Sequence, residues 1–130
     1  MSGGLELRLA TVLAEVLPVD TDDDGAVTVG HDGTLASLRV VGIADDLELV
    51  SLTQVLAWDL PLSRQARDRL AEQARDSQLG AVIAMEKTGK TADVMLRYNF
   101  PGTGLTDDAL RTLILLVLDK GAQIARALTA

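Results

Sequence analysis

Apolar residues near the two ends of the chain recur at steps of three and four, which is typical of amphipathic helices. The first such stretch covers positions 5–17, and Pro18 ends the pattern because proline cannot continue a helix. The second begins after Thr106, a plausible N-cap, and carries Asp107 and Asp108 in its first turn. Carboxylates there favour the positive end of the helix dipole. The sequence therefore predicts a helix at each end.

A third helix is predicted between them, in a strongly charged segment from Arg64 to about Gln78. Ser63 precedes it and can accept a hydrogen bond from a free amide of the first turn, and Gly80 follows its end. Its apolar positions are mostly small, which favours close packing against a sheet or another helix; they are Leu62, Ala66, Leu70, Ala71 and Ala74.

Between the helices, apolar and β-branched residues fall in short runs separated by turn residues, a pattern that predicts strands. Runs at 27–29, 35–43 and 47–58 form a three-stranded meander, and runs at 81–86 and 92–100 form a hairpin. The order is helix, three strands, helix, two strands, helix, or α-β-β-β-α-β-β-α. This order predicts an α+β fold in which helices pack on an antiparallel sheet.

The composition favours one folded domain covering residues 1–130. Almost half of the residues (48 %) are apolar, but Trp58, Tyr98 and Phe100 are the only aromatic ones, so aliphatic side chains must build the core. The chain has no cysteine, which excludes disulfides and thiolate chemistry and agrees with a cytoplasmic location. The apolar runs are too short or too often charged for a membrane span or a signal peptide.

The net charge of −7 is unevenly distributed along the chain. Residues 1–60 hold eleven acidic residues against Arg8 and Arg39, whereas residues 61–130 hold eight acidic and ten basic residues. An acidic chain repels nucleic acid and anionic lipid, so neither is an expected partner. This asymmetry agrees with an acidic loop that is simply solvated. It also agrees with a charged surface that orients self-association or attracts a basic partner.

Candidate sites for chemistry are few, and each has a simpler explanation. Asp20, Asp22, Asp24 and Gly25 match the opening of a calcium loop, but His31 occupies the position that requires a bidentate Glu. Residues 88–91 match the tail of a phosphate-binding loop. Such a loop must run into the N-terminus of a helix, whereas these residues are predicted to lie at the tip of a hairpin. As the only histidine, His31 has no nucleophile at a fixed spacing. We therefore expect no enzyme, no cofactor and no metal site.

The run at 47–58 has apolar residues on both faces of the predicted strand, so it requires two covering layers. The protein's own helices supply one layer; the other is the rest of the fold, a second copy or a client chain. The residues predicted to bind a partner are Leu49, Leu52, Leu56 and Trp58. Tryptophan is enriched among residues that dominate binding energy, so Trp58 is the strongest candidate if it is exposed.

The order of elements, together with the run Val55-Leu56-Ala57-Trp58-Asp59-Leu60-Pro61-Leu62 before the charged helix, resembles the YbjN-like family. The fold of that family is similar to that of type III secretion chaperones. The likeness extends over residues 5–128 and includes Phe100-Pro101 at the hairpin exit. The resemblance implies a small acidic protein, often dimeric, that holds unfolded or partly folded clients, and it implies no catalytic residue.

Two functions from different classes follow. The first is a non-enzymatic, chaperone-like or adaptor module that binds a polypeptide client or a regulatory partner protein and forms a homodimer. The alternative is a regulatory module that senses a small molecule or ion, either in the acidic loop from Asp20 to Asp24 or in a cleft between sheet and helix.

Overall fold

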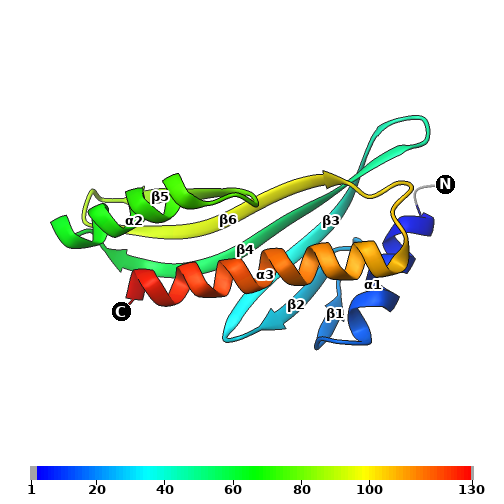
Figure 1. Ribbon diagram of the computed structural model, residues 1–130, viewed down its shortest axis with the longest axis horizontal. Helices are drawn as coiled ribbons and strands as arrows, with labels where there is room; N and C mark the ends of the chain where they lie inside the picture. The colour runs from blue at the N-terminus through cyan, green and yellow to red at the C-terminus, as the bar shows by residue number, and fades with distance from the viewer. Residues whose placement is uncertain (1–2, 130) are drawn as a thin grey trace.

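The computed structural model describes residues 3–129, which form a six-stranded antiparallel sheet and three helices (Figure 1). The predicted α+β class with an antiparallel sheet is confirmed. In chain order the elements are α1 (Gly3–Ala14), β1 (Val19–Thr21), β2 (Val27–His31), β3 (Thr34–Ala44), β4 (Leu47–Pro61), α2 (Arg64–Asp76), β5 (Ala81–Lys87), β6 (Thr91–Pro101) and α3 (Asp107–Thr129).

The strands lie in the order β1-β2-β3-β4-β6-β5, and every neighbouring pair is antiparallel. Strand β1 was not predicted, because its three residues lie in what reads as an acidic loop. It pairs with β2, with Val19 opposite Val29 and Thr21 opposite Val27. The remaining strands follow the predicted meander and hairpin, and β4, the longest, joins these two parts by pairing with both β3 and β6.

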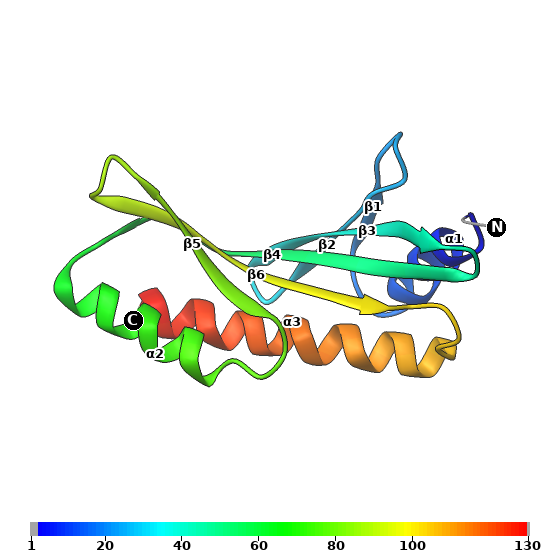
Figure 2. The same ribbon diagram turned by 90° about the horizontal axis from the view of Figure 1, so that it is seen from above.

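Helices α2 and α3 lie on the same face of the sheet, and the other face carries no helix of the described chain (Figure 2). Helix α3 crosses β4 and contacts α1 near one end and α2 near the other. The core is aliphatic and fills the space between α3 and the sheet; its fully buried large members include Leu9, Leu13, Leu38, Leu52, Leu96, Leu110, Ile114 and Leu118. No helix within residues 3–129 has the length and apolarity needed to cross a membrane.

Both predicted helix caps are confirmed. The Ser63 hydroxyl oxygen accepts a hydrogen bond of 3.0 Å from the Ala66 amide, and the Thr106 hydroxyl oxygen accepts one of 3.1 Å from the Ala109 amide. These bonds satisfy amides that have no partner inside the helix. Ser63 and Thr106 therefore correctly indicated in the sequence where α2 and α3 begin.

The ends of several elements differ from the predicted ones by two or three residues. Helix α1 ends at Ala14 instead of continuing to position 17: the amides of Val16 and Leu17 both bond to the Leu13 carbonyl, and the chain turns before Pro18. Helix α2 ends at Asp76 instead of Gln78. Strand β4 continues past position 58 to Pro61, because pairing with β6 extends to the end of the strand.

Candidate functional site

Strand β4 extends well beyond its neighbour β3. The last pair between them is Val55 with Leu35, so residues 56–61 have no partner strand on that side in the described chain. On the opposite side, β6 pairs with β4 as far as Pro61. The second half of β4 therefore presents a free edge, and such an edge is a ready template for another extended chain.

The free edge is distorted by bulges. The register of β4 against β6 shifts between Val55 and Ala57 and again between Ala57 and Leu60, and Asp59 has a φ angle of +50°. An Asp93 carboxylate oxygen accepts a hydrogen bond of 3.0 Å from the Asp59 amide. The β6 side chain thus holds the bulged segment in place. Bulges turn side chains in new directions and are common next to functional sites.

Charge pairing reinforces this arrangement. The Lys87 ammonium lies 2.7 Å from the Asp59 carboxylate and 3.0 Å from the Asp93 carboxylate. The hydrogen bond from the Asp59 amide, followed by the one from Lys87, lowers the pKa of Asp93 below its ordinary value. Hydrogen bonds to Asp59 and then Asp93 raise the pKa of Lys87. The Lys87 ammonium therefore bridges a carboxylate of β4 and a carboxylate of β6.

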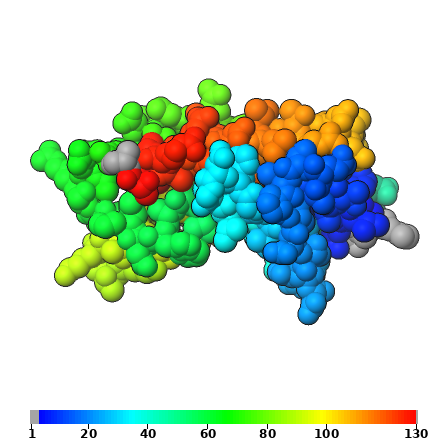
Figure 3. All heavy atoms as spheres, turned by 90° about the horizontal axis from the view of Figure 1, so that it is seen from below, coloured from blue at the N-terminus to red at the C-terminus, as the bar shows by residue number. Residues whose placement is uncertain are grey.

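A hollow of about 320 Å³ lies beside the free edge. It is lined by residues 32–35, which form the β2–β3 turn and the start of β3, by residues 55–58 of β4, and by four α3 side chains, those of Ala122, Ala125, Arg126 and Thr129. Figure 3 shows the cyan turn, the green end of β4 and the red end of α3 meeting on one face of the molecule. Because Ala122 and Ala125 have small side chains, the hollow extends as far as the surface of α3.

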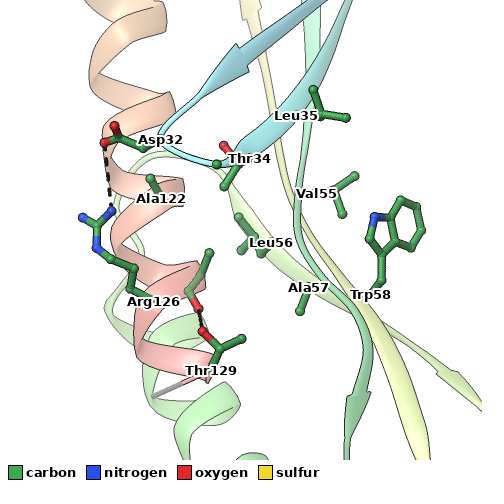
Figure 4. Close-up of a pocket in the computed structure, with 12 residues that line it drawn as sticks. Asp32, Thr34, Leu35, Val55, Leu56, Ala57, Trp58, Ala122, Arg126 and Thr129 are labelled. Atoms are coloured by element: carbon green, nitrogen blue, oxygen red, sulfur yellow. Dashed lines mark hydrogen bonds and ion pairs between the residues drawn. The ribbon is translucent and has the colours of Figure 1, made fainter.

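Side chains on β3 and β4 alternate around the hollow. Leu35, Val55 and Trp58 point away from α3, whereas Leu56 points toward it (Figure 4). Trp58 is 64 % exposed and Leu56 only 5 %. The edge therefore offers apolar surface on both of its faces.

Beneath the hollow, a buried amide joins three elements. Gln54 of β4 donates from Nε2 to the Thr34 hydroxyl at 2.8 Å and to the Leu118 carbonyl of α3 at 3.1 Å. The Thr34 hydroxyl donates in turn to the His31 carbonyl at 2.7 Å. These bonds fix the β2–β3 turn against β4 and α3. The Gln54 Oε1 atom is buried and has no hydrogen-bond partner within the described residues.

The four residues predicted to bind a partner do not form one surface. Trp58 is exposed and lines the hollow, and Leu56 forms part of its buried wall. Leu52 is fully buried in the core, so it offers no surface to a partner, contrary to the prediction. Leu49 is half-buried on the opposite face, paired with Val41 and Pro101. The four residues are divided in this way because alternate residues of a strand face opposite sides of the sheet.

An apolar row on the helix-free face of the sheet was missed. Register places Leu35 opposite Val55, Val55 opposite Met95 and Met95 opposite Ile83, so these four side chains form a continuous row across four strands. Leu35 is 59 % exposed. The alternation in each strand could have revealed each member, but only the register brings them together.

The acidic loop does not gather its carboxylates around one point. Asp20 belongs to β1, and Asp24 forms a 3.0 Å ion pair with Arg39 and accepts a hydrogen bond from the Ala26 amide. The hydrogen bond from Arg39, followed by that from Ala26, lowers the pKa of Asp24. The segment 88–91 forms a strand-to-strand turn and the start of β6, as expected. His31 ends β2, and its side chain is only 15 % exposed.

Comparison of the chain with protein-family models, with curated proteins and with solved structures finds no match. Its function must therefore be argued from the geometry of the free edge and the hollow.

Proposed function

We propose that this protein is a non-enzymatic binding module that holds an extended segment of another polypeptide along residues 56–61 of β4. The observation that carries the proposal is the free strand edge, which borders the hollow and carries Trp58, an exposed lining residue whose ring points away from α3. A client strand bonded to this edge would lie beside residues 56–61 of β4. It would be in line with β3 and beyond the β2–β3 turn, where β3 begins. Strand addition of this kind takes its affinity from main-chain hydrogen bonds and its specificity from pockets for alternate side chains.

Six residues of extended chain span about 20 Å, which allows roughly three side chains on each face. On one face, client side chains would enter the hollow against Leu56, Ala122 and Ala125. On the other, they would contact Leu35 and Trp58, which lie on the same side of the strands. The site therefore fits a segment that is apolar on both faces, such as a stretch of unfolded or partly folded protein.

The net charge of −7 disfavours acidic clients and favours neutral or basic ones through long-range attraction. From β2 onward, the order of strands and helices is also the order expected for a YbjN-like, secretion chaperone-like protein. This agreement supports the chaperone-like form of the proposal. The alternative, a module that senses a small molecule, would place its ligand in the same hollow without using the strand edge.

The test uses reduced and carbamidomethylated ribonuclease A, a basic chain that remains unfolded, as the probe. Titration followed by calorimetry should show saturable binding, which Trp58→Ser weakens by about tenfold or more, since buried tryptophans dominate such contacts. Leu7→Ser is the matched control, because Leu7 is 71 % exposed on α1 and does not line the hollow. Native ribonuclease A carries almost the same charge in a folded chain and should not bind. Equal binding of native and unfolded chains, or by both variants, would contradict the proposal.

A second copy of the chain is the competing occupant of this edge. Sedimentation velocity of the free protein distinguishes the two cases. If the edge binds a client, it must be accessible in whichever form of the protein, monomer or dimer, binds the unfolded chain. A dimer that no longer binds the unfolded chain, and a monomeric variant that regains binding, would assign the edge to self-association instead.

A further inference from the structure

Three side chains with metal-binding atoms converge where the β2–β3 turn contacts α3. The His31 Nε2 atom lies 2.5 Å from an Asp119 carboxylate oxygen and 3.8 Å from an Asp32 carboxylate oxygen. One ligand atom from each residue lies within 4.8 Å of the other two. His31 and Asp119 are 88 positions apart in the sequence, so only the fold brings them together.

The separations are close to those of a first-row divalent metal site. Ligand atoms bound tetrahedrally to zinc at about 2.0–2.2 Å lie roughly 3.3–3.5 Å from one another. Reaching that geometry requires His31 and Asp119 to separate by about 1 Å and His31 and Asp32 to approach by about 0.5 Å. The two carboxylates, whose ligand atoms lie within 4.8 Å of each other, must approach by up to about 1.5 Å. Side-chain rotation at the two aspartates, whose side chains are 55 % and 58 % exposed, can supply these shifts.

The chemistry of the three groups is also suitable. An imidazole nitrogen with two carboxylates is a donor set that zinc accepts, and three protein ligands leave a fourth position for water. The His31 ring is held by burial, whereas the exposed carboxylates leave a path for the ion. The group that competes with a metal is Arg126, whose guanidinium lies 4.0 Å from Asp32; its side chain is 63 % exposed and free to turn toward solvent.

We propose that His31, Asp32 and Asp119 form a binding site for a divalent transition metal of the zinc type. The ion would join the end of β2 and the following turn to the middle of α3. Asp32 also lines the hollow beside the free edge, so the ion would hold one wall of that hollow in place. The proposal does not depend on polypeptide binding, because it concerns only residues of this chain.

The test is titration of the untagged, chelator-treated protein with zinc chloride, followed by calorimetry and by amide NMR shifts. We expect saturable binding at one ion per chain, shifts centred on residues 30–34 and 117–121, and a higher melting temperature, because a ligand of the native state stabilises it. His31→Gln and Asp119→Asn should each weaken binding by about tenfold or more, comparable to the loss of a metal ligand or its supporting group.

Asp45→Asn, in the β3–β4 turn, is the matched control and should bind zinc as the wild type does. Circular dichroism without metal shows whether each variant remains folded, and a second variant, Asp32→Asn, preserves the test if His31→Gln does not fold. The proposal is overturned if 1 mM zinc leaves the amide shifts unchanged. It is also overturned if binding survives in all three ligand variants, or if the shifts are centred on the acidic loop at 20–24.

Discussion

Gly121 of α3 and Gln54 of β4 fit together so closely that no side chain can be added to the glycine. A Cβ atom built on Gly121 would lie 1.8 Å from the Gln54 Oε1 atom. Gln54 is fully buried and its amide is held by bonds to Thr34 and Leu118, so it cannot move aside without losing them. The glycine allows α3 to approach β4 directly beneath the hollow.

We predict that Gly121→Ala destabilises the fold by about 1–3 kcal/mol, the usual cost of overpacking a core. This occurs although alanine favours a helix over glycine by up to about 1 kcal/mol. Urea denaturation measures the change. Gly4→Ala in α1 is the control, because a Cβ there meets no atom within 4 Å, and it should be neutral or stabilising. A Gly121→Ala protein as stable as the wild type would contradict the close packing of α3 on β4.

The bulged end of β4 should show an acid-dependent stability. The folded-state pKa of Asp93 is lowered by the Asp59 amide and Lys87, so its ionised form is favoured in the native state. Its contribution is fully present above the unfolded carboxyl pKa of about 4 and is lost as the pH falls through the lower folded value. Asp93→Asn should therefore melt at a lower temperature than the wild type at pH 7.

The difference between the two melting temperatures should shrink progressively below about pH 4, where the carboxyl of the unfolded wild-type chain also becomes protonated. Melting curves from pH 7 to pH 2.5 measure it. Asp45→Asn, in the exposed β3–β4 turn, controls for the general loss of one negative charge. A difference between wild type and Asp93→Asn that is independent of pH would show that the Asp59–Asp93 bond does not act through the carboxylate.

Trp58 provides a direct optical signal, since it is the only tryptophan in the chain and is 64 % exposed. We predict red-shifted emission and ready quenching by acrylamide in the free protein. Adding unfolded, carbamidomethylated ribonuclease A, which has no tryptophan, should shift the emission to the blue and reduce quenching. A signal that is already blue-shifted and protected at low protein concentration would mean that Trp58 is covered without a client.

Much of the fold could be predicted from the sequence, because periodicity and capping are local properties. The helix starts at Ser63 and Thr106 and the five longer strands all follow from side-chain patterns. Strand β1 could not be predicted, because its three residues form a strand only through pairing with β2. Short strands of this kind depend on tertiary contacts.

The candidate site was predicted only in part. Trp58 was singled out from the sequence on the condition that it is exposed, and it is exposed. The hollow, however, needs residues 32–35, 55–58 and 122–129 together, and the sequence does not show that they meet. The bulge that shapes the free edge depends on the contact between Asp59 and Asp93, which lie 34 positions apart. Leu52 was misplaced because an apolar strand residue does not reveal which face its side chain occupies.

Hydrogen–deuterium exchange of the backbone amides, with and without unfolded ribonuclease A, tests the central claim most directly. In the free protein, we predict that amides of residues 56–60 directed toward the free edge exchange rapidly, while those paired with β6 are protected. Saturation with the probe should slow exchange at this edge by about tenfold or more, since a tenfold change corresponds to about 1.4 kcal/mol. Protection confined to the outer strands β1 or β5, or no change at residues 56–61, would contradict the account.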